Sequence, residues 1–228
     1  MGLKLESVVP WGRSLKEYIC MFALTPTDLQ SRILDCAGGP ASFNAEMIQQ
    51  GYSVISCDPI YQFTVSDIAQ RIQQTYPVIV EGVTTHQEKY VWQEIKSPTE
   101  LGQVRMNAMT QFLDDFPLGL EQGRYRTASL PVLDFQPRQF DLALCSHFLF
   151  TYSEHLSYDF HREAIATLCQ VATEVRIFPL LTLSGEISPY LQPLIEHLTK
   201  QGYLVTIQSV LYEFQKGGNQ MLQICHGA

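Results

Sequence analysis

The feature that most constrains this chain is a strand, helix, strand unit in its N-terminal quarter. Residues 32–36 and 53–57 are predicted as two short buried strands, and residues 41–51 between them carry apolar side chains at helical spacing before Gly51. Two strands joined through a helix by tight connections pair in parallel with a right-handed crossover. The chain is therefore expected to build a parallel α/β sheet.

The alternation of strands and helices returns in the second half of the chain. Further strands are predicted over residues 125–130, 140–145 and 174–181. Helices are predicted over residues 158–172 and from Ser188-Pro189 to Gly202, where a serine cap precedes a first-turn proline. This order favours an α/β sandwich with helices on both faces of a mostly parallel sheet.

The C-terminal residues break that rhythm. Residues 203–214 and 220–225 are predicted as two strands joined by a turn at residues 216–219. Strands this close in sequence pair antiparallel, because a parallel connection needs a dozen or more residues. We therefore expect a Rossmann-like, seven-stranded sheet that ends in an antiparallel hairpin.

A long segment, residues 61–123, separates the second and third predicted strands. It is too long for a plain connection, and it contains a predicted helix over residues 64–76. A second helix is predicted to begin at Ser97-Pro98-Thr99-Glu100, which combines a serine cap, a proline and a glutamate in the first turn. We expect a single domain over residues 1–228 with a helical insertion at about 61–123.

Composition narrows the classes of partner. The net charge of −8 opposes binding to nucleic acid, and no apolar run approaches the roughly 20 residues that cross a bilayer. Residues 1–10 lack the apolar segment of a secretory signal, and the six cysteines form no CxxC pair that would indicate a metal site. These features predict a cytoplasmic protein with a small-molecule partner, without nucleic acid, membrane or metal.

Two places at the carboxyl ends of the first strands carry candidate ligand-binding residues. Small residues at Ala37, Gly38 and Gly39 allow close approach of the backbone to a ligand, and a helix N-terminus follows them. Asp58 directly follows the second strand, where a carboxylate can accept hydrogen bonds from ribose hydroxyls. The alternatives are a plain tight turn for residues 37–39 and, for Asp58, a solvated aspartate at a strand end or a helix cap.

Residues 30–60 and 125–226 resemble the class I S-adenosylmethionine-dependent methyltransferases. Residues 33–39 are similar to the first motif of that family, and Asp58 is similar to its ribose-binding acid. The antiparallel hairpin distinguishes that family from nicotinamide-binding domains. One departure is Pro40-Ala41, which stands where the family usually has a further small residue.

The resemblance implies S-adenosylmethionine as cofactor and assigns a position to each candidate residue. Asp35 would brace the turn, Ala37 and Gly38 would face the methionine part of the cofactor, and Asp58 would hold the ribose. The remaining positions are Pro59 and Ile60 against the adenine, Ser129 and Leu130 beside it, and Ser146 and His147 nearest the transferable methyl group. His147 is a candidate general base, with a packing role as the alternative.

Three functions remain open at the level of sequence. The first is a methyltransferase that acts on a small-molecule acceptor, and the second is a non-catalytic protein that binds S-adenosylmethionine or S-adenosylhomocysteine. A nicotinamide-dependent oxidoreductase is disfavoured, because the turn lacks spaced glycines and the sheet ends in a hairpin. The insertion would build an acceptor pocket, extend the core or form a homodimer contact, and the sequence does not separate these roles.

Overall fold

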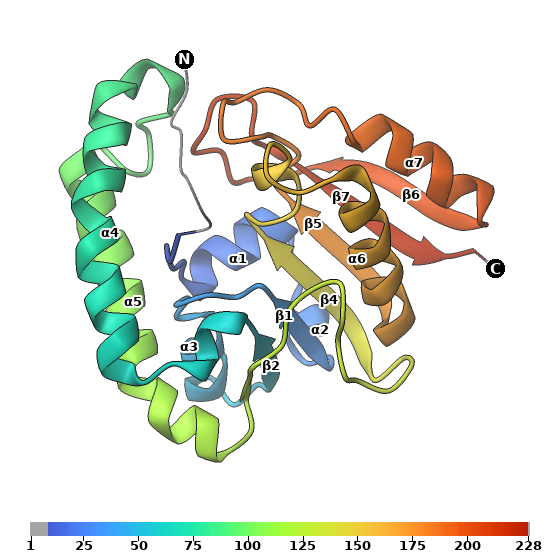
Figure 1. The fold of residues 1–228 in the computed structure, drawn as a ribbon, viewed down its shortest axis with the longest axis horizontal. Coiled ribbons are helices and arrows are strands. Elements are labelled where there is room, and N and C mark those ends of the chain that lie inside the picture. Colours follow the sequence, from blue (N-terminus) through green and yellow to red (C-terminus); the bar gives the residue numbers. More distant parts are fainter. Residues whose placement is uncertain (1–8, 228) are drawn as a thin grey trace.

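The computed structural model describes residues 9–227, and within them the strands form one seven-stranded sheet in the order β3-β2-β1-β4-β5-β7-β6 (Figure 1). The strands are β1 (Ile33–Cys36), β2 (Val54–Cys57), β3 (Tyr125–Arg126), β4 (Phe140–Ser146), β5 (Ala172–Phe178), β6 (Tyr203–Ser209) and β7 (Gln220–His226). Strands β1 to β5 pair in parallel, whereas β7 runs antiparallel to both β5 and β6. The predicted sheet and its C-terminal hairpin are confirmed.

Helices cover both faces of the sheet, as predicted. The helices of the first face are α1 (Leu15–Phe22), α2 (Pro26–Leu29) and α3 (Phe43–Gln49), which share one core cluster with β1 and β4. The helices of the second face are α6 (Tyr158–Val171) and α7 (Leu191–Lys200), which share a larger cluster with β4, β5 and β7. All four residues of β1 are buried, as expected for a parallel strand with helices on either side.

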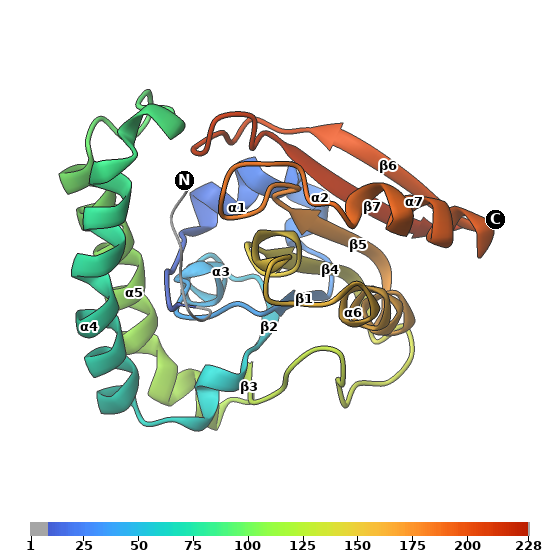
Figure 2. The same ribbon diagram turned by 45° about the horizontal axis from the view of Figure 1, so that its top comes forward.

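The helical insertion lies between β2 and β3. It contains the short helix η1 (Pro59–Gln62), α4 (Val65–Thr85), η2 (Gln87–Lys89) and α5 (Pro98–Glu121). The hydroxyls of Thr64 and Ser97 cap α4 and α5, and the start predicted at Ser97-Pro98 is confirmed. Figures 1 and 2 show α4 and α5 side by side along one end of the molecule.

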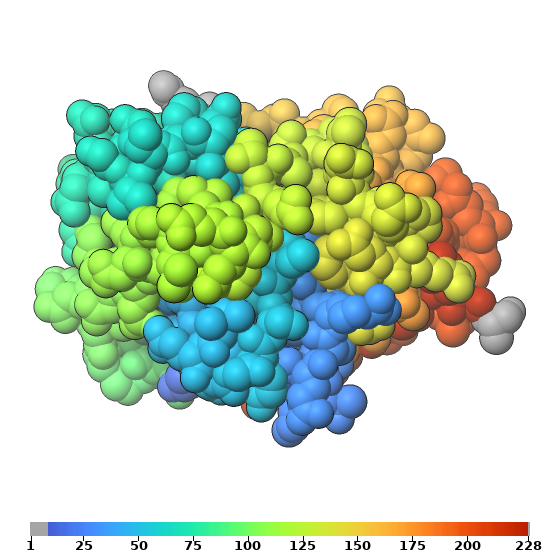
Figure 3. Space-filling view, turned by 90° about the horizontal axis from the view of Figure 1, so that it is seen from below, coloured from blue at the N-terminus to red at the C-terminus, as the bar shows by residue number. Residues whose placement is uncertain are grey.

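The insertion packs directly on the core. Its base is an aromatic cluster in which Tyr61, Phe112, Phe116 and Tyr125 are all buried and their ring centroids lie 5.0–5.9 Å apart. The space-filling view of Figure 3 shows the insertion, in teal and green, lying directly against the core. The insertion therefore has a fixed position over one end of the sheet.

Several predicted boundaries were wrong. Helix α4 continues through Pro77 to Thr85 instead of ending at residue 76, because Ile79 and Val83 bury their side chains against Leu101 of α5. This burial offsets the hydrogen bond that a proline removes from a helix. The second helix predicted late in the chain begins at Leu191, and the hydroxyl of Ser188 accepts a bond from the Tyr190 N–H instead of capping α7.

Two strands are shorter than predicted. The strand predicted over residues 125–130 keeps only Tyr125–Arg126, because this edge strand pairs with β2 alone and β2 ends at Cys57. The strand predicted over residues 203–214 ends at Ser209, where its pairing with β7 ends at Gln220. The residues released from both strands form loops beside the cavity described below.

No helix of residues 9–227 is both long enough and apolar enough to span a membrane. Residues 1–8, on which the expectation of no secretory signal partly rests, lie outside the described part of the chain.

Candidate functional site

A cavity of about 450 Å³ lies at the carboxyl ends of β1, β2 and β4 and extends towards the insertion. In a parallel α/β sheet this edge is where ligands bind. All but one of the residues predicted from sequence line this cavity: Ala37, Gly38, Gly39, Asp58, Pro59, Ile60, Ser129, Leu130, Ser146 and His147. The fold therefore brings together residues from four separate loops.

The turn after β1 is held in place by neighbouring backbone and side chains. Ala37 and Gly39 both have a positive φ, at 56° and 55°. The Gly38 N–H donates to the Cys57 carbonyl at 3.3 Å, and the Gly39 carbonyl accepts from the Tyr61 hydroxyl at 2.8 Å. The turn is thus defined in spite of Pro40-Ala41, the departure noted in the sequence.

Asp35 is the predicted residue that does not line the cavity. It is buried beneath the turn, where its carboxyl group accepts hydrogen bonds from the Tyr18 hydroxyl at 3.0 Å and the Ser56 hydroxyl at 2.9 Å. Burial raises the pKa of Asp35 to about 7. A Cβ at Gly38 would lie 2.3 Å from the Asp35 carboxyl oxygen, so the turn can rest on Asp35 only with glycine at position 38.

Asp58 links the turn after β1 to the start of η1. One of its carboxyl oxygens accepts the Gly39 N–H at 3.0 Å, and the other accepts the Ile60 N–H at 2.8 Å. Each carboxylate oxygen has a second lone pair, so the group can accept further bonds from a ligand. Burial raises the pKa of Asp58 to about 6, which leaves it mostly ionised at neutral pH.

Ser146 and His147 close the cavity at the end of β4. The Ser146 hydroxyl lies 2.9 Å from His147 Nδ1, and the His147 backbone N–H donates to the Phe178 carbonyl at 2.6 Å. Burial, followed by the nearby guanidinium groups of Arg13 and Arg105, lowers the pKa of His147 well below its usual range. The imidazole is therefore neutral at pH 7 and a weaker proton acceptor than a free histidine.

Arg13 also lines the cavity, and no local pattern in the sequence singles it out. Its guanidinium donates to the Trp11 carbonyl at 3.1 Å, whereas its buried Nε has no hydrogen-bond partner within the described residues. Within residues 9–227 no carboxylate forms an ion pair with Arg13. Burial and the charge of Arg105 lower the pKa of Arg13. An incompletely partnered, buried guanidinium calls for an anion from a ligand.

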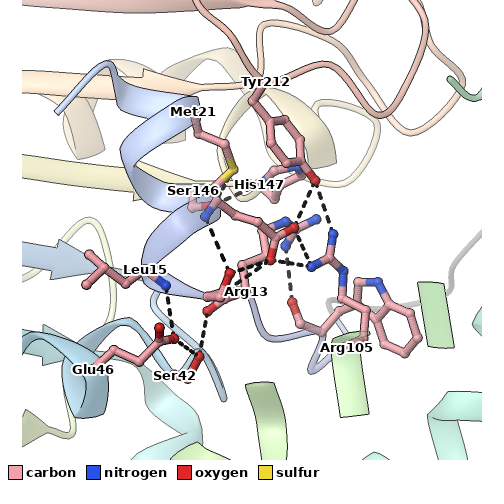
Figure 4. A network of polar contacts seen from close by, with 12 residues as sticks. Arg13, Leu15, Met21, Ser42, Glu46, Arg105, Ser146, His147 and Tyr212 are labelled. Carbon is pink, nitrogen blue, oxygen red and sulfur yellow. Dashed lines mark hydrogen bonds and ion pairs between the residues drawn. The ribbon is translucent and has the colours of Figure 1, made fainter. Parts of the chain in front are cut away.

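A second arginine beside Arg13 is fully paired through its terminal nitrogens (Figure 4). Arg105 of α5 donates to both carboxyl oxygens of Glu17, at 2.5 and 2.6 Å, and to the Tyr212 hydroxyl at 3.1 Å. Glu17 also accepts the Ser14 N–H at the start of α1. This network joins the insertion, α1 and the β6–β7 loop, and each partner is distant from the others in sequence.

Comparison with known proteins gives one full-length relative. No family model matches the chain. The uncharacterized protein MJ0045 of Methanocaldococcus jannaschii is 33% identical over 223 residues, covering 97% of this chain and 98% of the relative. The two proteins belong to one family. The aligned region covers nearly the whole of both proteins, so it includes the insertion.

Several solved methyltransferase structures are similar at low identity. Magnesium protoporphyrin IX methyltransferase from Synechocystis, with bound S-adenosylmethionine, is 12% identical, with 93% of this chain and 78% of that chain covered and a TM-score of 0.47. A TehB-like methyltransferase from Corynebacterium glutamicum is 14% identical, with 87% and 81% covered and a TM-score of 0.45. Both TM-scores are below 0.5, so the class I Rossmann-like fold of this MJ0045 family member is assigned from its own strand order and register.

Proposed function

We propose that this protein is an S-adenosylmethionine-dependent methyltransferase that acts on a small molecule. The observation that carries the proposal is that the turn after β1, Asp58, the loop at Ser129-Leu130 and the end of β4 all line one cavity at the carboxyl edge of the sheet. A nicotinamide-dependent reaction has less support, because the sheet ends in the antiparallel β7 and the turn lacks spaced glycines.

The residues of the cavity fit an adenosyl amino acid. At Gly39 no atom lies within 4 Å of the position that a Cβ would take, so a ligand can approach the backbone of the turn. Asp58 would hold the ribose hydroxyls, and Pro59, Ile60, Ser129 and Leu130 would surround the adenine. The Arg13 guanidinium, whose buried Nε lacks a partner, would bind the carboxylate of the amino-acid end.

When bound, the cofactor supplies an electrophilic methyl group on a sulfonium. The contribution of the chain is to position an acceptor in line with that methyl group, which can provide most of the rate enhancement. Ser146 and His147 lie at the end of β4, beside the predicted position of the methyl group. His147, being neutral, can accept a proton from an acceptor that must lose one, and this role stays a prediction.

Binding of the cofactor is tested by isothermal titration of the full chain with S-adenosylmethionine and S-adenosylhomocysteine, with NAD as the control ligand. We expect binding of both adenosyl ligands. Asp58→Ala should weaken it by about ten- to hundredfold, since charge-assisted hydrogen bonds contribute roughly 1.5–3 kcal/mol. Asp114→Ala, at an exposed position of α5, is the matched control and should bind as the wild type does.

Three results would each contradict a part of the proposal. Binding of NAD without binding of either adenosyl ligand would assign the cavity to another cofactor. Unchanged affinity in Asp58→Ala would remove the ribose assignment. Binding of the adenosyl ligands without methyl transfer to any acceptor would favour the non-catalytic alternative.

A further inference from the structure

The cavity continues beyond the proposed cofactor residues into a chamber under the insertion. The chamber is lined by apolar and aromatic side chains of the insertion, the segment before α1 and the β6–β7 loop, namely Trp11, Ile79, Val83, Tyr90, Leu101 and Phe214. Ile79, Val83 and Leu101 are buried even without a ligand. Walls of this composition bind the apolar part of a molecule, because burial of apolar surface is favourable.

Two aromatic rings give the chamber a preformed aromatic wall. Tyr90, which follows η2, and Phe214, in the β6–β7 loop, stack with ring centroids 4.9 Å apart and an angle of 25° between their planes. Trp92 packs edge-on against Phe214, with ring centroids 5.5 Å apart. Rings held in this way lose little conformational freedom when a ligand packs on them.

Backbone hydrogen bonds join the tip of the insertion to the β6–β7 loop beside the chamber. The Val91 N–H donates to the Phe214 carbonyl at 2.7 Å, and the Lys216 N–H donates to the Lys89 carbonyl at 2.9 Å. We call this pairing of residues 89–91 with residues 214–216 the latch. The cavity volume of about 450 Å³ is the size of a small-molecule site, so we expect the chamber to take a small molecule.

The charge of the lining favours an anion. Among the described residues that line the cavity, three are arginines (Arg13, Arg71 and Arg105), whereas Asp58 at the cofactor end is the sole carboxylate. Glu17 offsets Arg105, and the carboxylate of a bound cofactor would offset Arg13. The ammonium charge of the cofactor would remain, joined in S-adenosylmethionine by the sulfonium charge, so a cationic acceptor would be repelled and an anionic one attracted.

Two side chains that line the cavity have a buried polar atom without a partner among residues 9–227. Thr151 Oγ1, in η3 (Phe150–Tyr152), and Arg105 Nε form no hydrogen bond there, and both side chains are more than nine-tenths buried. Arg105 Nε–H is a donor, and a threonine hydroxyl can also donate. Buried donors without partners favour a ligand that brings an accepting oxygen.

We propose that the methyl acceptor is an apolar organic anion, with its apolar body in the chamber and an anionic oxygen facing Arg105 and Thr151. The proposal rests on the proposed function, because it places the acceptor beside the cofactor. It is more specific, because it names the charge and the polarity of the molecule that the chamber takes.

The test is a titration with three ligands that share one apolar body and differ in charge. The full chain, saturated with S-adenosylhomocysteine, is titrated with 4-phenylbutanoate, 4-phenylbutan-1-ol and 4-phenylbutylammonium. We expect the carboxylate to bind at least roughly tenfold more tightly than the alcohol, with the ammonium weakest. Equal or tighter binding of the alcohol or the ammonium, or binding of none of the three, would overturn the proposal.

Two substitutions locate the binding within the chamber. Phe214→Ala should weaken binding of the carboxylate and the alcohol alike, whereas Leu211→Ala, 93% exposed in the same loop, should change neither. Thr151→Val removes the unpartnered hydroxyl at nearly constant volume and should weaken the carboxylate several-fold. Thr84→Val, on the exposed side of α4, is its control. Unchanged carboxylate binding in both Phe214→Ala and Thr151→Val would place the ligand elsewhere and refute the assignment.

The same titration without S-adenosylhomocysteine separates this proposal from the proposed function. If S-adenosylhomocysteine does not bind but the carboxylate still binds in a Phe214-dependent manner, the cofactor assignment fails and the chamber assignment stands. The opposite result is that S-adenosylhomocysteine binds and Asp58→Ala weakens it, while 4-phenylbutanoate binds no more tightly than the alcohol or the ammonium. In that case only the chamber assignment fails.

Discussion

Two aspartates at the cavity show how burial changes the pKa of a carboxyl group. Asp35 and Asp58 are both aspartates at strand ends, and burial raises the pKa of each, to about 7 and about 6. Asp35 is held by two hydroxyl groups, whereas Asp58 is held by one backbone N–H of the turn, from Gly39, and one of η1, from Ile60. Asp58 is consequently the stronger acid and the better partner for ligand hydroxyls at neutral pH.

The raised pKa of Asp35 predicts a specific dependence of stability on pH. Folding favours the protonated form, so this stabilisation is complete below about pH 4 and is lost as the pH rises through about 7. Asparagine cannot ionise and keeps an acceptor for the Tyr18 hydroxyl. We expect the Tm of Asp35→Asn to fall less than that of the wild type between about pH 4 and pH 8, as measured by circular dichroism.

The control for this experiment is Asp114→Asn, a change at an exposed position that should follow the wild-type curve. Parallel curves for Asp35→Asn and the wild type would show that Asp35 has an ordinary pKa. Asp58 is present in all three proteins, so its own titration cancels in the comparison.

Sequence reasoning found the candidate residues that follow directly from strand ends, and it missed those defined by their partners. Asp58 and the turn at residues 37–39 were predicted because parallel strands present their carboxyl ends at one edge. Arg13 was missed, because its importance depends on its surroundings in the folded chain. Within residues 9–227 its buried Nε has no hydrogen-bond partner. The Arg105–Glu17 pair joins residues 88 positions apart, and no local pattern marks such a pair.

At the level of elements, the latch holds the insertion to the core. Helices α4 and α5 start with predictable caps, but their tip is placed by contacts with the β6–β7 loop. Tyr90 and Gln215 form an antiparallel bridge between these two segments. Local propensity predicts where the helices begin, whereas the length of α4 beyond Pro77 depends on burial against α5.

The bridge at Tyr90 and Gln215 gives a test of latch opening. Residues directly opposed in an antiparallel pair have Cα atoms about 4.5–5.5 Å apart, within the range of a disulfide. We expect the double variant Tyr90→Cys with Gln215→Cys to form a disulfide on oxidation and to release S-adenosylhomocysteine roughly tenfold more slowly when linked, since lid opening often limits release. Stopped-flow tryptophan fluorescence measures this rate.

The reduced form of the same variant is the control for that comparison. Equal release rates in the oxidised and reduced forms would mean that the ligand leaves by a route that does not involve the latch.

At the level of the whole molecule, the insertion and the sheet share a continuous packed interior. The aromatic cluster around Phe112 joins α5 to Tyr61 and to Tyr125 of β3. Both tryptophans, Trp11 and Trp92, pack against the cluster at the far tip of the insertion. Tryptophan fluorescence therefore reports on the insertion, whereas far-ultraviolet circular dichroism reports on the whole chain.

We expect urea to unfold the insertion and the sheet together. The two signals should give coincident transitions with one midpoint, as a cooperative single domain does. Trp92→Phe is the control. It leaves Trp11 as the single tryptophan and so separates the contributions of the two residues to the fluorescence change. An earlier transition in fluorescence than in circular dichroism would show that the insertion unfolds as a separate unit.

The walls of the chamber come from three distant stretches of the chain: residues 9–13, residues 79–105 and residues 212–218. During synthesis the first two stretches emerge well before the third, so the binding site is assembled only when nearly the whole polypeptide is available. A ligand that binds the folded form alone stabilises it in proportion to the logarithm of ligand concentration. The cell's supply of such a ligand would thus protect finished molecules and leave incomplete ones exposed to proteolysis.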